Sequence, residues 1–95
     1  MEIRILAPFT VKPEYVEALK QPLNDVISAS RKEPGCLQYD LQLEIGSSNS
    51  FVFFERWRSQ EDIDLHEKSA HFQQFIAALE GKIEHIEIKK LKLIV

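Results

Sequence analysis

Hydrophobic residues recur along this chain with two different periods, which divide it into extended and helical segments. Alternation with a period of two predicts strands at residues 2–9, 36–44 and 51–57, because successive side chains of a strand point to opposite faces. A last, long strand is predicted from about residue 84, with a β-bulge where the apolar phase changes across Lys89-Lys90. The loop-like residues 46–50 predict that the second and third strands form a hairpin.

The strand at 51–57 is where the pattern is most informative. It is apolar on both faces until Glu55 and Trp57, which fall on the same side as Phe53. The alternation in 36–44 places Leu37, Tyr39, Leu41 and Leu43 together on one face. A carboxylate on a buried face needs a polar partner, so we expect the functional site to lie near this strand.

The first helical region has its apolar residues at helical spacing from Pro13 to about Lys32. Pro13 suits the first turn of a helix, since its missing N–H removes no hydrogen bond there. Pro22 lies inside the helix, and an interior proline removes one backbone hydrogen bond. We therefore predict a bend at Pro22 without a break.

The second helical region contains two helices. Ser59, with Asp62 three residues later, is typical of a helix start, and Ser69 offers a second start. The second helix then has an apolar stripe of Phe72, Phe75, Ile76 and Leu79 and ends at Gly81. His66 and His71 would lie about 140° apart on one continuous helix, so a break between them decides how they are placed.

The predicted order of elements is β-α-β-β-α(α)-β, the split βαβ arrangement of the ferredoxin-like α+β class, in one domain spanning residues 1–95. Its helices cover only one face of a four-stranded sheet. The other face carries apolar residues, and exposing them costs about 25 cal/mol per Å². We therefore expect a homodimer in which two sheets face each other as a dimeric α+β barrel.

Composition narrows the functional classes. The net charge of −3 argues against nucleic acid as a partner, because phosphate binding needs a basic surface. No apolar run approaches the roughly 20 residues of a membrane helix, so we expect no membrane association and a cytoplasmic location. The single cysteine, Cys36, cannot form an internal disulfide, and we expect it to be a small buried hydrophobe.

Three motifs span nearly the whole chain: Ser30-Arg-Lys-Glu-Pro-Gly-Cys-Leu-Gln-Tyr39, Phe51-Val-Phe-Phe-Glu-Arg-Trp57 and His66-x-x-Ser69-x-His71-Phe72. In this order they resemble the antibiotic biosynthesis monooxygenase (ABM) domain, and within it the small bacterial proteins of the quinol monooxygenase type. The resemblance implies a monooxygenase with one pocket per subunit and no metal or flavin cofactor. Its expected partners are a small aromatic phenol or quinol and dioxygen, which together yield a quinone.

The resemblance also implies roles for individual residues. His66 or His71 would be the base or the hydrogen-bond partner of the substrate oxygen, and Glu55 would orient an imidazole. Several aromatic side chains would hold the substrate ring, in a hollow beneath His66, His71 and Trp57. These substrate-binding candidates are Trp57, Tyr39, Phe53, Phe72 and Phe75.

Two other functions stay open on the sequence. One is implied by the resemblance to another branch with similar motifs, an isomerase of a phosphorylated hydroxy-diketone of the quorum-sensing type, which would need cations such as Arg4, Arg31, Arg56 or Arg58 at the pocket. The other is a small-molecule-binding module without turnover. We expect no metal, because the spacing of five between His66 and His71 does not match the i, i+4 pair of a helical zinc site.

Overall fold

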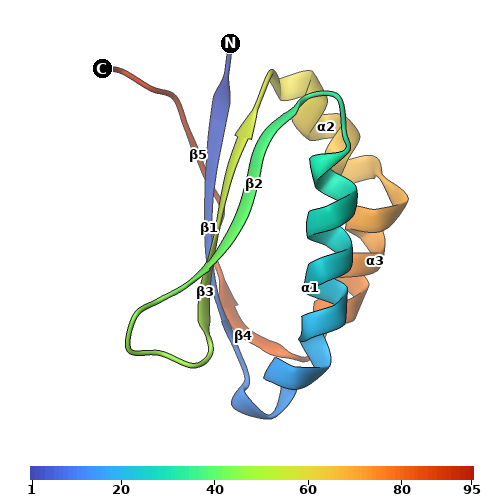
Figure 1. The fold of residues 1–95 in the computed structure, drawn as a ribbon, viewed down its shortest axis with the longest axis vertical. Helices are drawn as coiled ribbons and strands as arrows, with labels where there is room; N and C mark the ends of the chain where they lie inside the picture. The colour runs from blue at the N-terminus through green and yellow to red at the C-terminus, as the bar shows by residue number, and fades with distance from the viewer.

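The computed structural model describes residues 1–95 as a sheet packed against a layer of helices (Figure 1). Its elements are β1 (Ile3–Val11), a short 3₁₀ turn η1 (Pro13–Tyr15), α1 (Val16–Arg31), β2 (Cys36–Leu43), β3 (Ser50–Trp57), α2 (Gln60–Lys68), α3 (Ala70–Leu79), β4 (Ile83–Ile86) and β5 (Lys89–Leu91). This order confirms the predicted α+β, ferredoxin-like split βαβ arrangement.

The sheet is antiparallel and has the strand order β2-β3-β1-β4, with β5 pairing to the other end of β1. The predicted β2–β3 hairpin is present. In the register, Glu55 of β3 lies between Ile5 of β1 and Tyr39 of β2. Glu55 therefore stands at the centre of the sheet, on the face that the helices cover.

The predicted long last strand is divided into two short strands. Both pair with β1, β4 along Phe9–Val11 and β5 along Arg4–Leu6, so the interruption falls opposite Pro8. The carbonyl of Pro8 accepts a hydrogen bond from the Glu87 N–H at 3.0 Å, but proline has no N–H to return one. The ladder stops at this point, a few residues before the predicted bulge at Lys89-Lys90.

The register also shifts in β2, between Cys36 and Gln38. Tyr39 is buried as predicted, but Leu37, which the alternation placed on the same face, is 47% exposed. The shift takes Leu37 out of the regular pairing with β3. The prediction of one apolar face is therefore wrong at Leu37, and Leu43, at the end of β2, is 49% exposed as well.

The helices begin and end close to the predicted residues. Pro13 starts the 3₁₀ turn that leads into α1, and α1 continues through Pro22 without a break, as predicted. The side chain of Ser59 accepts a hydrogen bond from the Asp62 N–H and caps α2. Ser69 ends α2 and caps α3, which confirms the predicted break between the two histidines.

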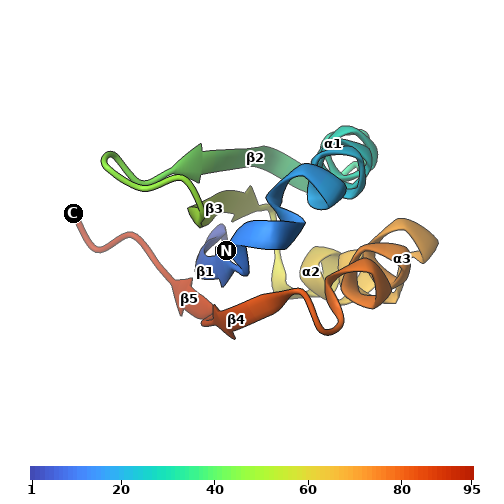
Figure 2. The ribbon, with the colours of Figure 1, turned by 90° about the horizontal axis from the view of Figure 1, so that it is seen from below.

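The three helices cover one face of the sheet, and the other face carries no helix (Figure 2). Alternate residues of β1 and β3 point into the core beneath α1, α2 and α3. The core residues are Ile5, Ala7, Phe9, Val11, Leu19, Leu23, Val26, Tyr39, Phe53, Trp57, Ile63, Phe75 and Leu79. None of the helices combines the length and the apolar character needed to cross a membrane.

Candidate active site

The break at Ser69 decides how the two histidines lie. Ser69 has an extended backbone, so α3 leaves in a new direction instead of continuing α2. Its hydroxyl donates a hydrogen bond to the His66 carbonyl at 2.6 Å and accepts one from the Phe72 N–H at 3.2 Å. As a result the rings of His66 and His71, five residues apart, have their centroids 6.0 Å apart.

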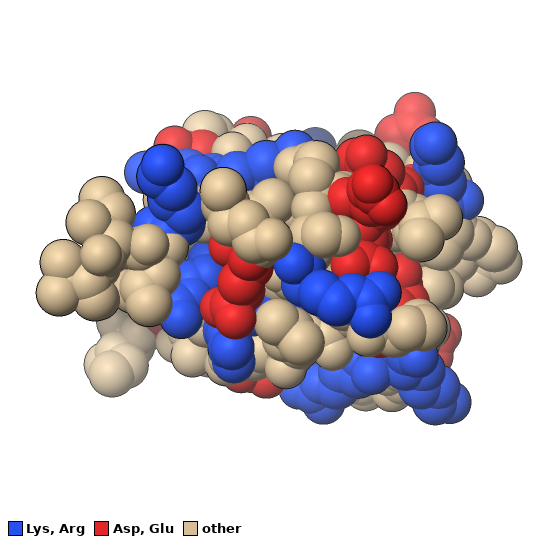
Figure 3. Space-filling view, turned by 90° about the horizontal axis from the view of Figure 1, so that it is seen from above, with Lys and Arg blue, Asp and Glu red and all other residues tan.

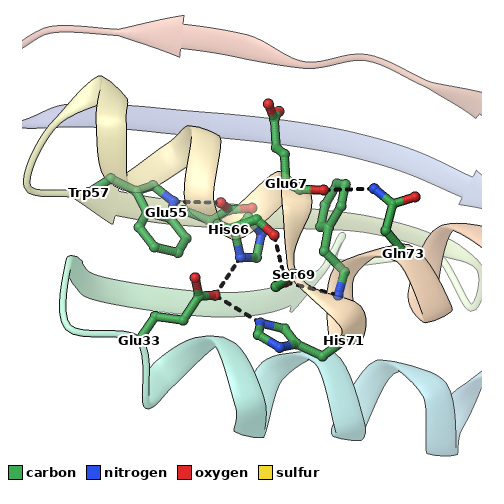
Figure 4. A network of polar contacts seen from close by, with 9 residues as sticks. Glu33, Glu55, Trp57, His66, Glu67, Ser69, His71 and Gln73 are labelled. Atoms are coloured by element: carbon green, nitrogen blue, oxygen red, sulfur yellow. Dashed lines mark hydrogen bonds and ion pairs between the residues drawn. The ribbon is translucent and has the colours of Figure 1, made fainter.

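Glu33 joins the two imidazoles (Figure 4). One of its oxygens, Oε2, lies 2.6 Å from Nδ1 of His66 and 2.9 Å from Nε2 of His71. Glu33 comes two residues after the end of α1, whereas His66 lies in α2 and His71 in the first turn of α3, so three helices position the cluster. The sequence reasoning missed Glu33 as a site residue, although it stands in the Glu33-Pro34-Gly35-Cys36 run that carries the family resemblance.

The contact with Glu33 fixes the proton on the His66 ring. A carboxylate only accepts hydrogen bonds, so Nδ1 donates, and the neutral ring then has a bare Nε2. Burial lowers the pKa of His66, which favours this neutral form. Nε2 has no hydrogen-bond partner in the protein. It is not among the fully buried side-chain polar atoms that lack a partner, of which Oγ of Ser30 is the only one, so Nε2 keeps some exposure to solvent.

Glu55 has a different partner from the one expected. The Trp57 indole N–H donates to Glu55 Oε1 at 2.9 Å, and no hydrogen bond joins Glu55 to either imidazole. The role of orienting an imidazole therefore falls to Glu33. Glu55 is only 6% exposed, and burial raises its pKa to about 7, against the opposing effect of the Trp57 N–H. It can accordingly gain or lose a proton near neutral pH.

Both Glu55 and His66 line an apolar pocket between the sheet and helices α2 and α3. The pocket has about 500 Å³ of free space when its open mouth is included, and a cavity volume of about 60 Å³. Four of the five aromatic candidates line it: Tyr39, Phe53, Phe72 and Phe75. Its other lining residues are Ile5, Ala7, Ile63, Glu67, Ile76, Ile86 and Ile88.

Trp57 and His71 do not line this pocket. Trp57 is fully buried, with its ring centroid 4.6 Å from that of His66. His71 instead borders a separate groove of about 170 Å³ between α1 and α3, together with Asp25 and Gln74. The expectation of one hollow beneath His66, His71 and Trp57 is therefore wrong, because the turn at Ser69 directs His71 toward α1.

The same cluster has the composition of a metal site. One donor atom each from Glu33, His66 and His71 lies within 4.8 Å of the others. The expectation of no metal site assumed two histidines on a single helix, and the break at Ser69 removes that assumption. Glu33 supplies the third donor, which the spacing of the histidines could not indicate.

No arginine lines the apolar pocket. The four arginines pair with carboxylates instead: Arg4 and Arg56 with Glu2, Arg31 with Asp40, and Arg58 with Asp62. Figure 3 shows the end of the molecule that carries both termini, where basic and acidic side chains are intermixed. The charged groups at the pocket are the carboxylates of Glu55 and Glu67.

Comparison with known proteins identifies the class that this fold and site define. Residues 2–78 match the family model described as antibiotic biosynthesis monooxygenase, and the chain belongs to this family. The family and its named relatives support a monooxygenase-like role.

Three relatives illustrate the similarity. The chain is 37% identical over 75 residues to "Putative monooxygenase YcnE" of Bacillus subtilis, covering 79% of each chain. It is 35% identical to "Putative monooxygenase Rv0793" of Mycobacterium tuberculosis, covering 79% of this chain and 73% of that protein. The crystal structure of PA3566 from Pseudomonas aeruginosa superimposes with a TM-score of 0.92 at 31% identity, covering 99% of this chain and 95% of that one.

Proposed function

We propose that this protein is a cofactor-independent monooxygenase that oxidises a small phenol, naphthol or quinol to a quinone with dioxygen. The observation that carries the proposal is the His66 imidazole, which Glu33 holds through Nδ1 and which lines an apolar pocket with aromatic walls. A base that faces an apolar pocket is the group needed to ionise an aromatic hydroxyl.

The first step is removal of the substrate proton. The hydroxyl of the substrate donates its proton to Nε2 of His66, and the imidazolium that forms is stabilised by Glu33 on its other nitrogen. A positioned base of this kind contributes roughly 10²- to 10⁴-fold to a rate. The product is a phenolate, which is a far better electron donor to dioxygen than the neutral phenol.

The second step is oxidation by dioxygen. One electron passes from the phenolate to dioxygen, and the two radicals combine with formation of a carbon–oxygen bond. Cleavage of the oxygen–oxygen bond, with return of protons, releases water and leaves the quinone. A phenol or naphthol loses two hydrogens and gains one oxygen atom to give a quinone, and a quinol undergoes the same change to give a hydroxyquinone. The second oxygen atom leaves as water, so the reaction needs no other reductant.

The pocket supplies orientation and a second proton site. Phe53, Phe72, Phe75 and Tyr39 provide faces and edges against which an aromatic ring can stack. In this proposal Glu55, whose pKa is raised to about 7 by burial, exchanges a proton with a second oxygen of a quinol substrate. In this proposal Trp57 acts indirectly, by holding Glu55 and packing against His66.

The test is dioxygen uptake with a naphthol or a reduced naphthoquinone, in buffer containing EDTA. His66→Gln is expected to lower kcat/KM by roughly 10²- to 10⁴-fold, because it removes the base. His85→Gln is the matched control, since this histidine is exposed on β4 and does not itself line the pocket. Uptake no faster than without protein, or equal rates for both variants, would contradict the proposal.

The isomerase alternative has less support from the charges. A phosphorylated substrate requires cations, whereas the pocket presents carboxylates and every arginine is paired elsewhere. Turnover of such a substrate that proceeds unchanged without dioxygen would favour it nevertheless. If an aromatic compound binds but no substrate is consumed, the protein is a binding module.

We also propose that the protein acts as a homodimer closed over the open face of the sheet. Leu6, Val52 and Phe54 are only half-buried there, and the last residues of the chain, Leu93–Val95, are exposed and apolar. Covering such a surface recovers about 25 cal/mol per Å². Sedimentation equilibrium is expected to give twice the mass of the 95-residue chain, and a stable single copy would contradict the dimer.

A further inference from the structure

Glu33, His66 and His71 form a set of three metal-ligating side chains of which the proposed oxidation uses only two, His66 and Glu33. The set comes from the end of α1, from α2 and from the start of α3, so it is fixed by the packing of three helices. Imidazole and carboxylate together suit divalent transition ions such as Zn²⁺. In the structure, hydrogen bonds join Glu33 to both imidazoles, and a cation bound between the three groups can replace these hydrogen bonds.

We propose that Glu33, His66 and His71 form a binding site for a divalent transition ion, with Zn²⁺ as its occupant, and that the bound ion switches off the base in the pocket. The binding half of this inference stands alone, while the inhibitory half rests on the proposed function.

The geometry fits such a site after a small adjustment. Two ligands that each lie about 2.1 Å from one ion are about 3 Å apart, or somewhat more in a tetrahedral site. The oxygen of Glu33 is 2.6 Å from Nδ1 of His66 and 2.9 Å from Nε2 of His71, close to that spacing. The two nitrogens lie within 4.8 Å and must approach each other. His71 can make this movement, since its side chain is 26% exposed and stands at the start of α3.

An entry path and the expected affinity also follow from the structure. The groove between α1 and α3 reaches His71 from outside and includes the carboxylate of Asp25, which favours a cation. Neither imidazole has a protein partner for its other ring nitrogen, and such partners normally raise affinity 10- to 100-fold. We therefore expect a dissociation constant on the order of micromolar, weaker than that of structural zinc sites.

Metal binding and base catalysis exclude each other at His66. An ion on Nδ1 takes the position of the proton that Glu33 now accepts, and the neutral ring then carries its proton on Nε2. The nitrogen that Glu33 does not hold, Nε2, therefore changes from an acceptor to a donor. It can no longer remove a proton from a phenol, so the ion inhibits the proposed oxidation.

The experiment is isothermal titration of untagged, EDTA-treated and desalted protein with ZnCl₂, followed by Co²⁺ as a spectroscopic probe. We expect one ion per chain and visible Co²⁺ absorption that Zn²⁺ abolishes. His71→Ala and Glu33→Gln are each expected to weaken binding at least tenfold, since loss of a ligand costs more than loss of its supporting partner. The control His85→Ala removes the third histidine, on β4, and is expected to bind as the wild type does.

Two results would overturn the site: no binding heat at 100 μM Zn²⁺, or binding that survives in both His71→Ala and Glu33→Gln. If either variant fails to fold, ¹⁵N NMR of the wild type keeps the test decisive. Zn²⁺ should move the His66 proton from Nδ1 to Nε2, and an unchanged tautomer would refute the site.

Because these readouts need no substrate, the site can stand if oxidation fails. Oxidation in EDTA can likewise stand if the site fails.

Discussion

Replacing Glu55 with glutamine tests the electrostatics of the pocket through protein stability. Glutamine has almost the same shape as glutamate and its oxygen can still accept the Trp57 N–H bond, but it carries no charge at any pH. The two proteins therefore differ mainly in the free energy of ionising a buried carboxyl group. We expect Glu55→Gln to become more stable than the wild type as the pH rises.

The sign and the size follow from the pKa of Glu55. Below pH 4.5 the group is protonated in the folded and unfolded chains and contributes no difference. As the pH rises from 4.5 to about 7 the unfolded chain loses its proton first, so the stability of the wild type falls. A pKa raised from 4.5 to about 7 converts, at about 1.36 kcal/mol per pKa unit, to roughly 2 to 3 kcal/mol between pH 5 and pH 8.

The assay is urea unfolding at several pH values from 5 to 8, at one fixed protein concentration because assembly also stabilises a fold. His66 contributes with the opposite sign, because its lowered pKa makes the folded protein lose stability as the pH falls. This contribution is present in both proteins and cancels when the wild-type stability is subtracted from that of Glu55→Gln. Glu84→Gln, at an exposed carboxylate on β4, is the matched control and should show no such trend. A difference between Glu55→Gln and wild type that is constant with pH would refute the reasoning.

Three further substitutions test how the site is held. Gly35→Ala is expected to destabilise by roughly 1 to 3 kcal/mol, because a Cβ there would lie 2.1 Å from the Asp62 side chain; an unchanged melting temperature would contradict this. Phe75→Ala is expected to lower the free energy of unfolding, measured in urea, by roughly 3 to 5 kcal/mol. Ile76→Ala should lower it by less, because Ile76 is 44% exposed on the same helix. Ser69→Ala removes the α3 cap and is expected to cost roughly 0.5 to 2 kcal/mol, with equal stability counting against the cap.

Much of the fold could be predicted from local patterns. Alternation in β1 and β3 fixed which side chains face the helices, and serine caps marked the starts of α2 and α3. The fourth strand could not be predicted correctly, because its interruption depends on Pro8, which lies nearly eighty residues away in the sequence. Leu37 was misplaced for a similar reason, since a register shift depends on the neighbouring strand.

The candidate site was only partly predictable. The aromatic lining and His66 follow from the face of each strand and helix on which they lie. Glu33 follows from no periodicity, because it is in the connection after α1 and meets the histidines only when three helices pack together. The directions of His71 and of the Glu55 carboxylate depend on a single turn and a single indole N–H, which side-chain patterns do not encode.

The central claim is that Glu33 holds His66 with its proton on Nδ1 and a bare Nε2 toward the pocket. Long-range ¹H–¹⁵N NMR of the histidine rings, in EDTA at pH 7, measures this tautomer directly. The account predicts a neutral His66 ring with the proton on Nδ1, and a change of tautomer or protonation in Glu33→Gln. An imidazolium, or a neutral ring protonated on Nε2 in the wild type, would contradict it.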